Sequence, residues 1–224
     1  MVEQDHRVLY RRDGVERGQA AGANGPLQGN NLNYSGDFLI EYEEIVEPLF
    51  EGTIIDIESI GSFNNCYLDD DSRQYKDIIP VIFGYIFGKR LIILCAENEE
   101  EEITLLKSTI IRLIDRLPRP FYAFNTRFEK GVTFHACSLN INFEYELNAF
   151  PKEKKKYTVQ NLGLNNYDDP FFDDGFLCLK AWENGDFENS VKHNRSCLLK
   201  ERDILLMRGY REPDRLELKS IKSD

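Results

Sequence analysis

An apolar run that ends in acids, Ile54-Ile55-Asp56-Ile57-Glu58, gives the chain its most informative strand signal. At the two-residue period of a β-strand, Ile55 and Ile57 lie on one face, while Asp56 and Glu58 lie on the other. Two neighbouring carboxylates repel one another and raise each other's pKa. Such a pair is usually neutralised by a cation, most often a hydrated divalent metal. The alternative is an edge strand with a solvated acidic face.

Composition indicates one domain of ordinary size with an appendage. The chain has 224 residues, 42% of them hydrophobic, and a formal net charge of −11. Its isoelectric point is near 4.9. This charge repels nucleic acid, so any contact with a phosphate backbone must come from a local basic patch or through a bound metal.

The cysteines predict a reduced, cytoplasmic protein. Their number is odd and no pair has the CxxC spacing. No signal-peptide pattern is present at the N-terminus. The longest apolar stretches, 78–87 and 91–96, are too short to span a bilayer, so no membrane partner is expected. The five thiols belong to Cys66, Cys95, Cys137, Cys178 and Cys197.

Hydrophobic periodicity predicts an α/β domain with a mixed sheet flanked by helices. Residues 1–49 are expected to form a largely irregular extension, with a short strand near Val8–Tyr10 and a short helix or loop over 40–50. Residues 50–212 form the predicted domain and 213–224 a tail. Strands are predicted at 53–58, 79–87, 90–96, 121–124 and 141–147. Helices are predicted from Asn98 to Leu117 and over 126–139, 157–164, 176–184 and 187–208.

Two further segments carry candidate functional residues. In Phe124–Glu129, a strand meets a helix, so Glu129 can reach over the end of the sheet towards Asp56 and Glu58. In the predicted helix 187–208, His193, Cys197 and Glu201 are spaced i, i+4 and i+8 and line one stripe. A lone histidine near a helix start is more often a cap or a surface residue than a catalyst.

These three segments resemble the motifs of the DEDD exonuclease superfamily, the DnaQ-like branch of the ribonuclease H-like fold. Asp56-Ile57-Glu58 is similar to the first motif, Asp-x-Glu on a strand. Residues 125–129 resemble the second, Asn-x-x-Phe-Asp opening a helix, with Glu129 in place of aspartate. Residues 193–197 look closest to the YprB-like predicted exonucleases, in which His-Asn-x-x-Asp is common. The resemblance covers roughly residues 50–210.

The resemblance implies a 3′–5′ exonuclease that uses two Mg²⁺ or Mn²⁺ ions on single-stranded DNA or RNA ends. Asp56 would bridge the metals, Glu58 would bind the metal on the nucleophile side, and Glu129 would hold the second. His193 would be the general base.

One position departs from this pattern. The fourth carboxylate is expected at position 197 or 198, where this chain has Cys197 and Leu198. A thiol is a poor ligand for Mg²⁺. Glu201 stands in for the missing acid, or the site works weakly with one metal, or an inactive module binds nucleic acid or a protein. His193 and Cys197 also have zinc-binding spacing, but no second matched pair is nearby, so zinc is not expected.

Candidate contacts to nucleic acid flank these motifs. They are Asn125, Arg127, Asn194, Lys154, Lys155 and Lys156. The lysine run is equally well explained as a solvated loop before a helix. A protein partner could dock on the N-terminal extension.

The remaining acids are expected to be mostly solvated. These are the clusters 69–71, 168–169 and 173–174, of which the last two flank Phe171 and Phe172 and could form a lip for a partner. Glu144 and Glu146 share one strand face, and one of them could approach the site.

Overall fold

A mixed β-sheet forms the centre of the chain. A computed structural model describes residues 7–9, 39–47, 49–97 and 100–220. In chain order the elements are β1 Arg7–Leu9, β2 Leu39–Ile45, β3 Thr53–Gly61, the 3-10 helix η1 Ser72–Tyr75, β4 Ile78–Phe87, β5 Arg90–Ala96, α1 Glu100–Ile114, β6 Phe121–Ala123, α2 Thr126–Cys137, β7 Tyr145–Glu146, α3 Lys155–Leu162, α4 Gly175–Glu183 and α5 Phe187–Arg208.

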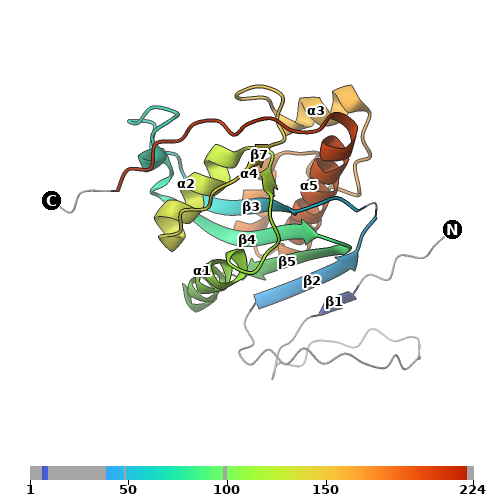
Figure 1. The fold of residues 1–224 in the computed structure, drawn as a ribbon. Coiled ribbons are helices and arrows are strands. Elements are labelled where there is room, and N and C mark those ends of the chain that lie inside the picture. The colour runs from blue at the N-terminus through green and yellow to red at the C-terminus, as the bar shows by residue number, and fades with distance from the viewer. Residues whose placement is uncertain (1–6, 10–38, 48, 98–99, 221–224) are drawn as a thin grey trace, which may run out of the picture.

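The sheet has the strand order β1-β2-β5-β4-β3-β6-β7 (Figure 1). The β1–β2, β2–β5, β5–β4 and β4–β3 pairs are antiparallel, whereas β6 is parallel to β3 and β7 is parallel to β6. β4 and β5 form the predicted hairpin, with Gly88 at φ 54° in its turn. Glycine adopts this backbone conformation without a steric penalty.

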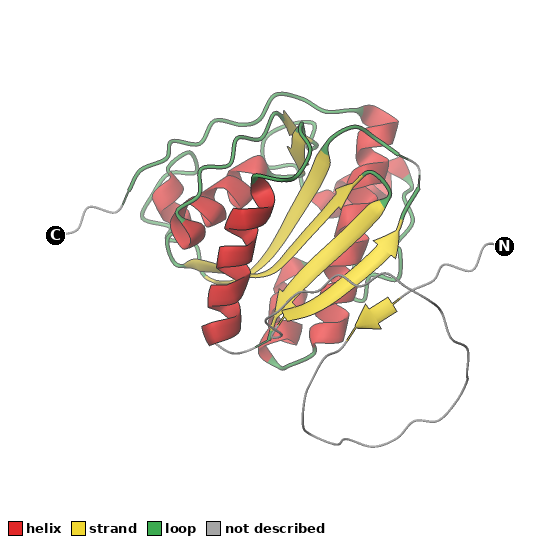
Figure 2. Ribbon diagram, turned by 60° about the horizontal axis from the view of Figure 1, so that its bottom comes forward, coloured by secondary structure: helices red, strands yellow, loops and turns green. Residues whose placement is uncertain are grey.

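Helices cover both faces of the sheet (Figure 2). Alternation along β3 sends Ile55 and Ile57 into a core shared with α1 and α2. Ile54 belongs to the second core, which contains side chains of α4 and α5. Asp56 and Glu58 have the same parity as Ile54, so they face α4 and α5. The predicted separation of apolar and acidic faces on this strand is therefore confirmed.

The fold class is confirmed at the level of an α/β domain with a mixed sheet and flanking helices. The strand predicted at 90–96 and the helix predicted at 187–208 have the observed bounds. The other three strands predicted between residues 53 and 124 differ from the observed strands by one to three residues at their ends, and the other four predicted helices differ by up to three residues. Asn98, expected to cap α1, lies outside the described residues, as does Tyr10 of the predicted first strand.

Two element predictions were wrong. Residues 40–50 were expected to form a helix or loop, but Leu39–Ile45 is strand β2, paired with β5. Glu44 on this strand is buried and accepts hydrogen bonds from Arg195. Because Arg195, far away in the sequence, compensates for the charge of Glu44, an acid can be buried in a segment whose sequence looked too polar for a strand. Of the strand predicted at 141–147, only Tyr145–Glu146 pairs as β7.

Gly84 allows α5 to lie close against the sheet. It is the β4 partner of Asp56. A Cβ atom at position 84 would stand 2.0 Å from Asn194 Oδ1 and 2.8 Å from Leu198 Cδ1. Because position 84 has no side chain, Asn194 can reach Asp56 across the strand. None of the helices in the described ranges combines the length and the apolar character needed to cross a bilayer.

Candidate functional site

A pocket of about 210 Å³ opens where β3 runs on past the end of β6. On β3, β6 pairs only with Thr53 and Ile54. On this side, the edge of β3 at Asp56 therefore has no strand of the described residues beside it, and the start of α2 lies there instead. The carboxyl ends of parallel strands are a common place for ligand sites. The residues that line the pocket are Asp56, Ile57, Glu58, Phe124, Asn125, Phe128, Glu129, Lys155, Asp173, Gly175, His193 and Cys197.

The three segments singled out by the sequence meet in this pocket. Asp56 is 5% exposed, and its Oδ2 accepts a 2.7 Å hydrogen bond from Asn194 Nδ2. His193 Nε2 lies 3.5 Å from Glu58 Oε1. Glu129, in the first turn of α2, lines the same pocket and is buried. The convergence of residues 56, 58, 129 and 193 is therefore observed.

The ammonium group of Lys155 lies among the carboxylates. Lys155 Nζ is 2.9 Å from Asp56 Oδ1 and 2.5 Å from Glu201 Oε1. Burial lowers the pKa of Lys155, but the Asp56 and Glu201 carboxylates outweigh it and hold the pKa well above its ordinary value. Glu201 is fully buried on α5 and faces the same side as Asp56. One side chain thus supplies a positive charge where the sequence predicted a metal.

This lysine does not satisfy all the acids. Glu129 Oε2 and Glu201 Oε2 are buried and have no hydrogen-bond donor within the described part of the chain. Burial, reinforced by the charge of Asp56, raises the pKa of both carboxyls well above the ordinary value. Burial also raises the pKa of Glu58, to about 7. These acids outnumber the one ammonium of Lys155, and their raised pKa values mean that bound protons compensate for part of the missing positive charge.

His193 is held from behind by an aspartate. Its Nδ1 lies 2.8 Å from Asp169 Oδ1, and its Nε2 points to Glu58 and, at 3.7 Å, to Cys197 Sγ. Asp169 also accepts hydrogen bonds from Lys200 and from two backbone N–H groups. Burial disfavours the imidazolium, but the Cys197 sulfur, Glu58 and Asp169 together hold the pKa of His193 above its ordinary value.

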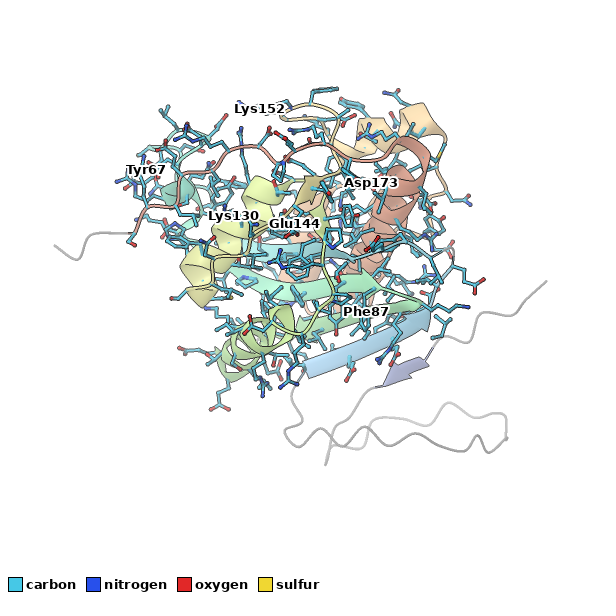
Figure 3. All side chains as sticks on the ribbon, in the orientation of Figure 1. Tyr67, Phe87, Lys130, Glu144, Lys152 and Asp173 are labelled. Carbon is cyan, nitrogen blue, oxygen red and sulfur yellow. The ribbon has the colours of Figure 1, made fainter. Side chains whose placement is uncertain are left out.

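Three residues of this site were missed or misread from the sequence. Asp169 was expected in a solvated cluster, but it is 2% exposed. Cys178, on α4, was named only among the scattered cysteines and not as a site residue, although its sulfur lies within 4.8 Å of ligand atoms of Glu58 and His193. Asp173, which is labelled in Figure 3, was also expected in solvent, but it contacts buried Lys200 Nζ at 2.7 Å. No local sequence pattern marks these positions, because the path of the loop between α3 and α4 places them at the site.

The predicted nucleic-acid contacts are divided by the structure. Asn125 is exposed at the pocket, and Lys154 and Lys156 are exposed beside it. Asn194 is fully buried, and its amide group is directed to Asp56, so the prediction of a surface contact was wrong. Lys155 likewise binds acids of the pocket instead of lying in a solvated run.

Arg127 turns away from the pocket. Its guanidinium lies 3.7 Å from Asp214 of the C-terminal segment, and it is absent from the pocket lining. Glu146, considered as an additional acid of the site, is buried but accepts hydrogen bonds from Asn148 and from the backbone N–H of Asp214. Neither residue therefore contributes to the pocket wall.

Comparison of the chain with protein-family models, with curated proteins and with solved structures gave no match.

Proposed function

We propose that this protein is a metal-dependent 3′–5′ exonuclease of the ribonuclease H-like type, acting on single-stranded DNA or RNA. The observation that carries the proposal is the convergence of Asp56, Glu58, Glu129 and His193 in one pocket, with Glu201, buried on α5, joined to Asp56 through Lys155. These acids come from β3, α2 and α5, which are far apart in the sequence. The motif resemblance of these segments and the mixed sheet beneath them support the same proposal.

The position of Lys155 supports cation binding. Its Nζ marks a place where a positive charge is shared by Asp56 and Glu201. The unpaired buried oxygen of Glu129 supplies a further carboxylate ligand at the pocket wall. Carboxylate oxygens are the ligands that Mg²⁺ and Mn²⁺ prefer. Lys155 is the first residue of α3, so its flexible side chain can swing outward and free this position for a hydrated ion.

In the proposed reaction, Asp56, Glu58, Glu129 and Glu201 hold one or two Mg²⁺ or Mn²⁺ ions. When bound, the metal lowers the pKa of the attacking water and stabilises the leaving oxygen. His193 Nε2, oriented by the contact of Asp169 with the opposite ring nitrogen, would accept the proton of that water when the imidazole is neutral. Asn125, Lys154 and Lys156 lie at the exposed rim, where they can contact phosphates of the strand.

A second function is favoured by the same lysine. If Lys155 keeps its ion pairs with Asp56 and Glu201, the negative charge of these two carboxylates is already compensated without a metal. Cys197 also supplies a thiol at the position where the motif has an acid. The alternative proposal is therefore an inactive module of this fold that binds nucleic acid or a protein partner.

A hydrolysis assay separates the two proposals. Labelled single strands of DNA and RNA, with free and with 3′-phosphorylated ends, are incubated with the full chain and Mg²⁺ or Mn²⁺. We expect metal-dependent release of nucleotides from free 3′ ends. Asp56→Asn, which keeps the size of the side chain, is expected to lower the rate at least about 100-fold. Asp77→Asn, at an exposed acid distant from the pocket lining, is the matched control.

Equal rates of nucleotide release by Asp56→Asn and wild-type protein would show that the assay measures a contaminating nuclease. No metal-dependent hydrolysis by wild-type protein, with retained binding of the labelled strand, would replace the exonuclease proposal by the inactive module.

A further inference from the structure

A second set of potential ligands overlaps the proposed exonuclease site at Glu58 and His193. His193 and Cys197 of α5, Cys178 of α4 and Glu58 of β3 meet there. Both sulfurs are buried, with Cys178 1% and Cys197 3% exposed. The sequence showed only the His193/Cys197 pair, whose spacing suits zinc but which had no matched partner. The structure supplies that partner, Cys178, together with a carboxylate.

Two of the distances between these atoms match those expected around a single tetrahedral ion. With Zn–N near 2.0 Å and Zn–S near 2.3 Å, neighbouring ligand atoms are separated by about 3.3–3.8 Å. His193 Nε2 lies 3.5 Å from Glu58 Oε1 and 3.7 Å from Cys197 Sγ. One ligand atom each of Glu58, Cys178 and His193 lies within 4.8 Å of the others. Cys178 and Cys197 belong to separate close groups that share Glu58, so side-chain movement would have to bring all four ligands onto one ion.

The histidine is oriented as a metal ligand. Metal-binding histidines usually donate their second ring N–H to a carboxylate, which fixes the ring and its tautomer. His193 Nδ1 has this partner in Asp169, at 2.8 Å. Asp169 is itself fixed by Lys200 at 2.8 Å and by the N–H groups of residues 171 and 173, so Nε2 is aimed into the pocket by a rigid support.

The other buried thiols show what an ordinary core cysteine has around it. Cys137, the last residue of α2, packs in the core that α2 shares with α1, and Cys95 donates to the carbonyl of Ala96. Neither belongs to a group of three or more close ligand residues within the described parts of the chain. Cys178 and Cys197 differ because each lies beside Glu58, and Cys197 also lies beside His193.

We propose that Glu58, Cys178, His193 and Cys197 form a site for one thiophilic divalent cation of the zinc class. Thiolate and imidazole ligands select Zn²⁺ and Co²⁺ over Mg²⁺, which prefers oxygen. Each thiol that binds gives up its proton to solvent and forms a metal–sulfur bond. The site goes beyond the proposed exonuclease: it uses Glu58 and His193 of that proposal for a different ion, and binding of this ion does not require hydrolysis.

Cobalt provides a direct test, because thiolate ligands give Co²⁺ a sulfur-to-metal charge-transfer band and tetrahedral geometry gives intense visible bands. Metal-free full-length protein is titrated with Co²⁺ and then with Zn²⁺, in the absence of nucleic acid. We expect both bands to appear with one equivalent of Co²⁺ and to be displaced by one equivalent of Zn²⁺. An excess of Mg²⁺ should not displace them.

Variants assign the ligands. Cys178→Ser should weaken the charge-transfer band and lower the Zn²⁺ affinity at least about tenfold. Cys137→Ser, which also alters a buried thiol, should leave both unchanged. A wild-type spectrum without charge transfer overturns the proposal, and this measurement needs no variant to fold. Equal Zn²⁺ affinity in Cys178→Ser and Cys137→Ser overturns it too. Loss of hydrolysis alone, with cobalt spectra as expected, would count against the exonuclease and leave this site standing.

Discussion

Lys155 is the residue on which the electrostatics of the pocket depend most. Its Nζ bridges Asp56 and Glu201, and both acids are buried. Removing one partner of a buried ion pair leaves the opposite charge without compensation, which costs more than the pair contributes. The same lysine occupies the place that a metal would need.

Lys155→Met keeps most of the apolar stem and removes the charge. Without divalent ions we expect the free energy of unfolding to fall by about 3 kcal/mol. Saturating Mg²⁺ or Mn²⁺ should restore about 2–3 kcal/mol, because ligand binding at 100 times its Kd stabilises by about that amount. Urea unfolding with and without metal measures both effects, and Lys156→Met, at an exposed neighbour, is the control. A variant as stable as wild type without metal would mean that the acids are protonated instead of charged.

Cys197 is the residue that we expect to decide which metal the proposed site prefers. Its sulfur belongs to a close group with Asp56 and Glu58, at the position where the motif expects a carboxylate. Cys197→Asp replaces a soft ligand by a hard one, so Mg²⁺-dependent hydrolysis should rise about tenfold. Cys197→Ser, which removes the sulfur without adding a charge, is the control and should show no gain. Equal rates in both variants would argue against a ligand at position 197.

At the scale of the element, the position of α5 depends on Gly84, whose lack of a side chain lets the helix lie close to the sheet. Gly84 leaves room for Asn194 and Leu198, and Asn194 holds Asp56 with a 2.7 Å hydrogen bond. Overpacking of a buried contact typically costs about 1–3 kcal/mol. Gly84→Ala should therefore lower the free energy of unfolding by about that amount.

A double-mutant cycle tests whether the cause is this contact. Asn194→Ala removes the side chain that a Cβ at position 84 would meet, so the two substitutions together should cost less than the sum of the single ones. If the losses in the free energy of unfolding are additive, the effect of Gly84→Ala has another cause, for instance a change in the β-strand propensity of β4.

The same elements show how far the sequence could predict the site. Asp56 and Glu58, Glu129, and the His193–Glu201 stripe were placed correctly because strand alternation, a helix start and a helical stripe are local patterns. Asp169 and Cys178 could not be placed, because their positions depend on the path of the loop before α4. Strand β2 was missed because its buried acid, Glu44, is compensated by Arg195, which lies 151 residues further along the chain.

At the scale of the whole molecule, the C-terminal segment after α5 is tied back onto the domain. It crosses over α2 towards η1 (Figure 1), where Asp71 pairs with Glu217 as an isolated β-bridge. Asp71 is buried, although it was predicted to be solvated. It accepts hydrogen bonds from Arg73 and, at 3.1 Å, from Lys219. The Arg73 guanidinium, with help from Lys219, holds the pKa of Asp71 well below its usual range against the opposing effect of burial.

Asp71→Asn should make the protein less stable at neutral pH by about 1–2 kcal/mol, the value of hydrogen bonds to a charged group. A carboxyl whose pKa is depressed on folding adds stability above its unfolded pKa, near 4, and loses it as the pH falls towards the folded pKa. The gap between wild type and variant should therefore close progressively below pH 4. Urea unfolding across this range measures it, with exposed Asp70→Asn as the control. A gap that stays constant with pH would mean that packing, and not the charge of Asp71, fastens the C-terminal segment.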